Sequence, residues 1–343
     1  MEKLKEEFIG CLLGGAVGDA LGYPVEFLKL NEIRDKYGEY GIEELEVKFL
    51  EGKSLISDDT QMTLFTVEGI LNSKNIEDVS VAKSTFYSYI RWLYTQGYPI
   101  SERYEGLVQK KESILLNYKE LFSQRAPGHS CLTALIYPKN NKFGTIEHRV
   151  NNSKGCGGIM RVAPAGLYNI NNNEEAFKLG CELAAITHGH PTGYLSAGAF
   201  SSIISDVCNG VSIEGAVDKA IILLEQSTES EETLNAINKA VILSKEGYPS
   251  PYQLARLGEG WIGEEALSIA IYCALSYSDD FEKALKLAVN HSGDSDSTGA
   301  ICGNIMGAKL GLSAIPKEWI ENLELADLIM EMAEKLYYLV EKE

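Results

Sequence analysis

Apolar residues recur along most of the chain at the three- and four-residue spacing typical of amphipathic helices. Residues 4–18 show this first, with Leu4, Phe8 and Leu12 along one face. Another helix is expected after Ser57, which has the character of an N-cap. Further helices are predicted at 77–95, 104–122, 130–137, 173–187, 191–208, 212–225, 230–245, 262–276, 279–290, 296–311 and 323–341. No sustained run alternates as a β-strand does, so the pattern predicts an all-α protein.

The segments between these helices predict loops rather than domain boundaries. Residues 28–56 are expected to be irregular, and shorter loops are expected at 124–129 and 151–158. No Ser/Pro-rich linker or fixed-period repeat interrupts the chain. A length of 343 residues allows one large domain or two ordinary ones. Because apolar content is even throughout, we expect one compact domain over residues 1–343.

Charge narrows the possible partners. The chain has 31 Lys and Arg against 49 Asp and Glu, for a net charge of −18. Such an acidic surface repels nucleic-acid phosphates, and no basic, aromatic-rich stripe offsets it. Direct binding to a nucleic-acid backbone is therefore not expected. A phosphate-bearing small molecule could still be held locally by backbone amides or metals.

Cysteine spacing and the N-terminus predict a cytoplasmic protein. The seven cysteines include no C-x-x-C pair, which favours reduced thiols over disulfides or a zinc site. The apolar start resembles a signal peptide, but Glu2, Glu6 and Glu7 stand where positive charge belongs and Asp19 interrupts the run. No apolar run reaches the roughly 18 residues needed to span a bilayer, so no membrane segment is expected.

Two distant segments concentrate carboxylates and hydroxyls just before apolar helical patterns. They are Ser57-Asp58-Asp59 and Asp294-Ser295-Asp296-Ser297. For each segment alone, helix capping is a sufficient explanation. If the segments meet, their four carboxylates cannot all stay ionised without compensation. Two divalent cations would supply it, because carboxylate and hydroxyl oxygens suit Mg²⁺, Mn²⁺ or Ca²⁺.

Glu26 is the candidate general acid or base. It follows a Gly-Tyr-Pro turn and lies between the apolar residues Val25 and Phe27. Partial burial would raise its pKa towards neutrality, as proton transfer requires. The alternative is an ordinary exposed loop glutamate.

Glycine-rich loops offer candidate phosphate contacts. Residues Gly155, Cys156, Gly157 and Gly158 precede Ile159 and Met160, and Gly128 lies in a second such loop. Their backbone amides could hold phosphates, although glycine-rich loops are commonly only turns. His188, at a predicted helix end, could cap that helix or bind a sugar hydroxyl. No nucleophilic triad is evident.

Together these residues resemble the ADP-ribosylglycohydrolase family. The matching motifs are Gly18-Asp19-Ala20-Leu21-Gly22-x-Pro24-Val25-Glu26-Phe27, Ser57-Asp58-Asp59-Thr60, Arg125-Ala126-Pro127-Gly128, Gly157-Gly158-Ile159-Met160-Arg161-Val162-Ala163-Pro164, Thr187-His188-x-x-Pro191, Leu257-Gly258-x-Gly260-Trp261-x-x-Glu264-Glu265-Ala266 and His291-Ser292-Gly293-Asp294-Ser295-Asp296-Ser297-Thr298-Gly299-Ala300. They keep the family's order over roughly residues 8–315.

The resemblance implies an orthogonal bundle of helices with two magnesium ions in a cleft. One ion would be held by Ser57, Asp58 and Asp59, and the other by Asp294 and Ser297, with Asp296 bridging. Glu26 would stand near the scissile bond. The backbone at Gly128 and at 155–159 would bind a diphosphate, and His188 a ribose hydroxyl. Ser57 replaces a common threonine, and Cys156 interrupts the glycine-rich loop.

The implied activity is hydrolysis of the bond at C1″ of an ADP-ribosyl group on a protein side chain or a small acceptor. Asp58 and Asp296 would serve it through the metals, and Glu26 through proton transfer. Three alternatives stay open: a hydrolase of another nucleotide-linked sugar, a non-catalytic ADP-ribose-binding or crystallin-like protein, and an immunity protein that acts by occlusion. The acceptor and the oligomeric state are not indicated by the sequence.

Overall fold

Helices make up nearly all regular structure in the protein. The computed structural model describes residues 2–48, 52–74, 79–99, 102–105, 113–138 and 142–342. In those ranges no β-strand forms, and the only sheet-like pairs are three isolated bridges. The prediction of an all-α fold is therefore confirmed.

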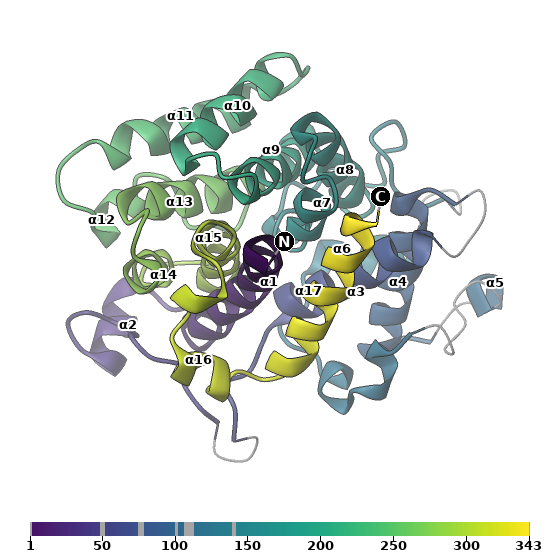
Figure 1. The fold of residues 1–343 in the computed structure, drawn as a ribbon, viewed down its shortest axis with the longest axis horizontal. Helices are drawn as coiled ribbons and strands as arrows, with labels where there is room; N and C mark the ends of the chain where they lie inside the picture. The colour runs from purple at the N-terminus through teal and green to yellow at the C-terminus, as the bar shows by residue number, and fades with distance from the viewer. Residues whose placement is uncertain are drawn as a thin grey trace.

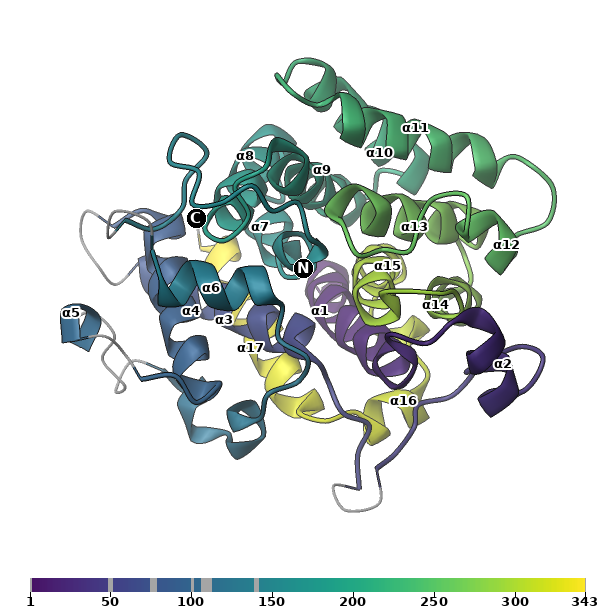
Figure 2. The same cartoon turned by 180° about the vertical axis from the view of Figure 1, so that it is seen from behind.

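The helices are α1 (Glu2–Gly22), α2 (Leu30–Tyr37), α3 (Asp58–Ser73), α4 (Val81–Thr95), α5 (Glu102–Glu105), α6 (His129–Ile136), α7 (Ala163–Tyr168), α8 (Asn173–Ala185), α9 (Pro191–Cys208), α10 (Ile213–Glu225), α11 (Glu231–Ser244), α12 (Pro251–Leu254), α13 (Gly263–Ser276), α14 (Phe281–Val289), α15 (Ser295–Leu310), α16 (Lys317–Asn322) and α17 (Ala326–Glu341). Helix α1 runs through the middle of the molecule beside α15, while α10 and α11 form one edge (Figure 1). The view from behind shows the same arrangement (Figure 2).

Helices α1 and α15 approach so closely that only glycine fits between them. They run in opposite directions, and glycines on each face the other in the pairs Gly10–Gly307, Gly14–Gly303 and Gly18–Gly299. A Cβ added at Gly18 would lie 2.0 Å from the carbonyl oxygen of Gly299. At the end of this contact, Gly22 lies against the backbone of Ser295 and Asp296. The end of α1 is therefore fixed at the beginning of α15.

Two predicted segments differ from the structure. Residues 28–56 include α2, which the pattern missed because Ile33 is its only buried residue. The predicted helix at 104–122 overlaps α5 at residues 104 and 105, but it is wrong from residue 113 on, where short 3₁₀ turns occur at Leu115–Asn117 and Lys119–Phe122. Leu115 and Leu121 are both buried there, yet six residues place them about 120° apart around an α-helix. Residues 106–112 of that prediction lie outside the described part.

Helix boundaries elsewhere follow the prediction to within a few residues. Helix α4 begins at Val81 after the N-cap Ser80, later than the predicted residue 77, and residues 77 and 78 lie outside the described part. Helix α1 is long and apolar enough to cross a membrane by length and composition alone. However, 89% of its most apolar window is buried in the protein, as in the core helix of a soluble protein.

The close contact between α1 and α15 predicts that Gly18→Ala destabilises the protein. The added methyl group collides with backbone that cannot rotate away, so we expect the free energy of unfolding to fall by about 1–3 kcal/mol or more. Urea unfolding followed by circular dichroism measures the change.

Gly215→Ala is the matched control, because Gly215 is a helical glycine whose nearest neighbours are side chains 3.2 Å from the added Cβ. Alanine has the higher helix propensity, so this variant should be neutral or slightly more stable. Equal stability of the two variants would contradict the proposed role of the glycine contact.

Candidate active site

The two acidic segments form the first turns of α3 and α15. Ser57 caps α3, and its Oγ accepts a hydrogen bond from the amide of Asp59 at 3.2 Å. Asp294 caps α15, and its Oδ1 accepts from the amide of Ser297 at 3.3 Å. The capping explanation is thus correct locally. It is incomplete, because all the residues of these two turns are buried, with no more than 4% of each exposed.

Asp19 joins α1 to the beginning of α3, a role that sequence reasoning missed. Its side chain is fully buried and accepts hydrogen bonds from the amide of Ser57 at 3.0 Å and from the amide of Thr60 at 3.2 Å. The Thr60 hydroxyl also donates to it. A lone carboxylate within a long apolar run was the available signal. Asp19 therefore orients the α3 segment.

Glu26 lies across from the α15 segment. Its amide donates to the carbonyl of Gly22 at 3.0 Å, so the side chain follows directly from the end of α1. Carboxylate oxygens of Glu26, Asp294 and Asp296 all lie within 4.8 Å of one another. The half-buried Glu26 is therefore part of the acidic cluster, and the alternative of an exposed loop glutamate is wrong.

In the described part of the chain, no basic side chain forms an ion pair with these carboxylates. Among the ion pairs of the described residues, none involves Glu26, Asp19 or the four aspartates of the two segments. Oδ2 of Asp59 and Oε2 of Glu26 are buried without a hydrogen-bond partner. Such orphaned anionic oxygens are costly unless a cation compensates them.

Burial raises the pKa of every carboxyl group in the cluster, and repulsion between the carboxylates adds to this for all of them except Asp296. Burial, followed by the charges of Asp296 and Asp294, raises the pKa of Glu26 to about 11. Burial also raises the pKa of each of the four aspartates, and the charge of Asp296 adds to the effect on the other three. The two segments, 235 residues or more apart in sequence, are therefore electrostatic neighbours.

These residues fit divalent magnesium well. The cluster offers carboxylate and hydroxyl oxygens with two buried orphan oxygens, and hard cations prefer such ligands. Two helix N-termini add only about half a positive charge each, which is too little for so many carboxylates.

The glycine-rich turn beside the cluster is a short 3₁₀ helix, Cys156–Gly158. The Cys156 thiol donates to Oδ2 of Asp294 at 2.6 Å, which places the turn against the acidic cluster. Several of its amides are already engaged within the protein: Gly155 donates to Ser153 Oγ, Cys156 to the Trp261 carbonyl, and Ile159 and Met160 to the Cys156 carbonyl. The side chains of Ile159 and Met160 are buried in the core, so only their backbone faces the turn.

His188 lies beneath this turn rather than on an open surface. Only 1% of it is exposed, and a Cβ added at Gly157 would meet its ring at 3.2 Å. Its Nδ1 shares a hydrogen bond of 2.8 Å with the Thr187 hydroxyl. Burial and the nearby Arg161 lower the pKa of His188 to about 3, so the imidazole is neutral. The structure shows it supporting the turn, and contact with a ribose stays a prediction.

The second candidate loop contacts the other acidic segment. The amide of Gly128 donates to Oδ2 of Asp58 at 3.1 Å, and the amide of Asp58 donates to the Arg125 carbonyl at 3.0 Å. The Arg125–Gly128 loop is therefore joined at both ends to the first residue of α3. Here the amide of Gly128 serves an aspartate rather than a phosphate.

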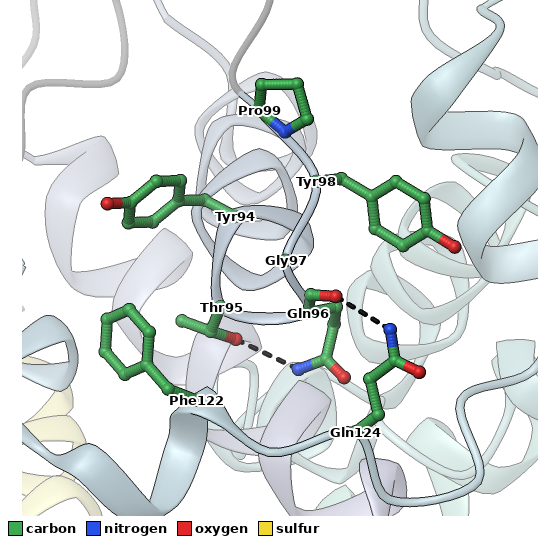
Figure 3. A pocket seen from close by; sticks show the side chains of 8 residues that line it. All are labelled: Tyr94, Thr95, Gln96, Gly97, Tyr98, Pro99, Phe122 and Gln124. Carbon is green, nitrogen blue, oxygen red and sulfur yellow. Dashed lines mark hydrogen bonds between the residues drawn. The ribbon is translucent and has the colours of Figure 1, made fainter.

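A pocket of about 500 Å³ lies next to the same loop (Figure 3). Tyr94, Tyr98 and Phe122 line it together with Gln124, whose side chain donates to the Gln96 carbonyl at 2.8 Å. The side-chain amide of Gln96 (Nε2) in turn donates to Oε1 of Gln61, a residue of the first turn of α3. The pocket is thus joined to the acidic cluster through α3 and the 123–125 segment.

Comparison with known proteins identifies the family of the chain. The chain matches the ADP-ribosylglycohydrolase family over residues 1–343 and belongs to it. It is 24% identical to the ADP-ribosylarginine hydrolase Tri1 of Serratia proteamaculans, over 97% of this chain and 80% of that protein. It is 22% identical to the ADP-ribosyl-[dinitrogen reductase] glycohydrolase of Rhodospirillum rubrum, over 92% of this chain and 90% of that one.

A solved structure shows the same fold. It is described as an ADP-ribosylglycohydrolase-related protein complex, and it aligns with a TM-score of 0.66 and 23% identity over 99% of this chain and 100% of that one. The protein is therefore an all-α hydrolase of the ADP-ribosylglycohydrolase family, whose members act on ADP-ribosyl linkages.

The raised pKa values predict how stability depends on pH when divalent ions are removed. Unfolded Asp and Glu titrate near pH 4, while the folded cluster binds protons at higher pH. Above about pH 4 the folded state therefore holds more protons, and its stability decreases as pH rises. In EDTA, the melting temperature should be lower at pH 8 than at pH 6.

Bound Mg²⁺ should oppose this decrease of stability with rising pH. The increase in melting temperature on adding Mg²⁺ should be larger at pH 8 than at pH 6, because the metal competes with protons for the same oxygens. Differential scanning fluorimetry measures both. Asp279→Asn is the control, since Asp279 is paired with Lys309 on the surface and lies outside the cluster. A melting temperature that rises with pH in EDTA would contradict the assignment.

Proposed function

We propose that the protein is a metal-dependent ADP-ribosyl hydrolase, which uses two Mg²⁺ ions to cleave the glycosidic bond at C1″ of the distal ribose. The observation that carries this proposal is the meeting of carboxylate oxygens of Glu26, Asp294 and Asp296 within 4.8 Å, where the buried Oε2 of Glu26 has no hydrogen-bond partner. A non-catalytic scaffold has no need to maintain so costly a group of buried carboxylates.

Each acidic segment would hold one ion. Ser57, Asp58 and Asp59 supply ligands for the first, Asp294 and Ser297 for the second, and Asp296 is shared. The shared role of Asp296 is supported by its place between the two segments, since its charge raises the pKa of Asp58 and Asp59 in one and of Asp294 in the other. When bound, Mg²⁺ would supply positive charge and coordination for the ribose hydroxyls and a water, and Mn²⁺ could substitute.

Glu26 would carry the proton. Burial among carboxylates favours its protonated form, so it can donate to the leaving nitrogen or oxygen as the bond to C1″ breaks. Water forms the new bond to C1″ and returns a proton to Glu26, which restores the enzyme. The remaining carboxylates face the positive charge that develops on the ribose in glycosyl transfer.

The loops beside the cluster would position the ADP moiety. Backbone at Gly128 and at Gly155–Met160 borders the two acidic segments, so a diphosphate held there lies next to the ions. His188 supports the glycine-rich turn from below, and its neutral imidazole can accept or donate to a ribose hydroxyl if the turn opens. The aromatic pocket next to Gln124 leaves room for the acceptor.

The substrate is proposed to be an ADP-ribosylated protein or small molecule in the cytoplasm. One relative is named for ADP-ribosylarginine and another for ADP-ribosylated dinitrogen reductase, so one name specifies a modified amino acid and the other a modified protein. ADP-ribosyl-arginine is therefore the first substrate to test, followed by ADP-ribosyl-serine and O-acetyl-ADP-ribose, while free ADP-ribose, the product of the proposed reaction, should not be consumed.

Two variants test the proposed roles. Glu26→Gln removes the acidic proton but keeps the shape of the side chain, so kcat should fall by roughly 10²–10⁴-fold with both metals still bound. Asp296→Ala removes the shared ligand, so both ions should bind more weakly together. Release of ADP-ribose measured by chromatography gives the rate, and isothermal titration with Mg²⁺ or Mn²⁺ gives the stoichiometry.

Asp279→Asn is again the matched control, because it removes one carboxyl charge far from the cluster. Its activity and metal binding should equal those of the wild-type protein. Full activity in EDTA would exclude metal dependence, and two tightly bound ions in Asp296→Ala would exclude the shared role of Asp296.

A further inference from the structure

The turn that carries Glu26 places a phenylalanine, Phe27, at the position with positive φ. Leu28 donates to the Val25 carbonyl at 3.0 Å, and Glu26 has φ −48° and ψ 140°. Phe27 follows with φ 67°. These values define a type II turn, whose third residue is ordinarily glycine or asparagine. A bulky L-residue in the left-handed region costs about 1–2 kcal/mol.

The Phe27 side chain gains little from burial. It is 65% exposed, and its only ring partner among the described residues is Trp261. The two rings are stacked with centroids 5.2 Å apart and planes inclined by 20°. An aromatic pair of this kind stabilises by about 0.5–1.5 kcal/mol beyond its buried area. Backbone strain at Phe27 is therefore offset mainly by Trp261.

Trp261 is held firmly by the rest of the site. Its carbonyl accepts the amide of Cys156 at 3.1 Å, which joins it to the glycine-rich turn. Two residues earlier, the carbonyl of Glu259 accepts a hydrogen bond from the amide of Asp294 at 2.8 Å, and Gly260 packs against Asp294. The backbone of Trp261 is thus fixed to the α15 acidic segment and to the glycine-rich turn.

We propose that the stacked pair Phe27–Trp261 is a clasp that positions Glu26 over Asp294 and Asp296 for proton transfer. The pair joins a strained turn, in which only Phe27 is exposed, to the fixed backbone segment that carries Trp261, so Glu26 keeps its place only while the rings stay together. Phe27 and Trp261 are positioning residues. This inference rests on the proposed function, because the role it assigns is the placement of the proposed acid.

The test uses variants that separate the ring from the backbone. Phe27→Asn removes the ring, yet asparagine tolerates a positive φ, so the protein should fold with equal or greater stability. Trp261→Ala removes the partner. In saturating Mg²⁺ with ADP-ribosyl-arginine, each variant should lower kcat by roughly tenfold or more with KM within about threefold, because a displaced catalytic group costs rate.

Three comparisons make the result specific. The double variant should be no slower than the slower single variant, because both changes break the same contact. Phe27→Tyr keeps the ring and should restore most of the rate. Tyr248→Asn removes an aromatic ring that is 93% exposed elsewhere on the surface and should have no effect.

A readout independent of turnover reports the clasp itself. Trp92 and Trp319 are buried, so acrylamide quenching of tryptophan fluorescence reports mainly on Trp261. Quenching should increase in Phe27→Asn and remain as in the wild type in Phe27→Tyr. Wild-type kcat in Phe27→Asn, or losses that multiply in the double variant, would overturn the clasp alone. A wild-type protein inactive on ADP-ribosyl-arginine, ADP-ribosyl-serine and O-acetyl-ADP-ribose would overturn the proposed function and the clasp with it.

Discussion

The close contact of α1 with α15 is the constraint on which the rest of the structure depends. Glycines at every fourth position of both helices allow the two backbones to touch, and any side chain there would collide with a carbonyl. This contact fixes where α1 ends relative to where α15 begins. Because Glu26 follows the end of α1 and Asp296 lies at the start of α15, the same contact brings them together.

The site formed in this way is unfavourable without a cation. Buried carboxylates repel one another, their pKa values are raised, and two of their oxygens lack partners. The protein compensates only partly, through the helix N-termini and the hydrogen bonds that Asp19 accepts from the beginning of α3. The uncompensated cluster therefore lowers the stability of the folded state, and the binding of divalent ions would raise that stability again.

The loops around the cluster are held in place by hydrogen bonds to the acidic segments and to Trp261. Gly128 donates to Asp58, the Cys156 thiol donates to Asp294, and the Cys156 amide donates to the Trp261 carbonyl. These loops have little regular structure of their own, so their shape is determined by the acidic segments and by buried residues such as His188. A substrate bound at these loops, as proposed, would exchange some of these contacts for its own.

The sequence by itself determined the all-α class, most helix ranges and the acidic residues of the site, because helical periodicity and N-cap chemistry are local properties. It could not reveal the role of Asp19, the burial of His188, or the stacking of Phe27 on Trp261. It also failed at α2, where a single buried residue left no helical pattern, and at 113–122, where it predicted a helix and the chain forms short 3₁₀ turns. Only the tertiary structure decided which distant residues meet, because that depends on the backbone-to-backbone packing of α1 with α15, which no local pattern records.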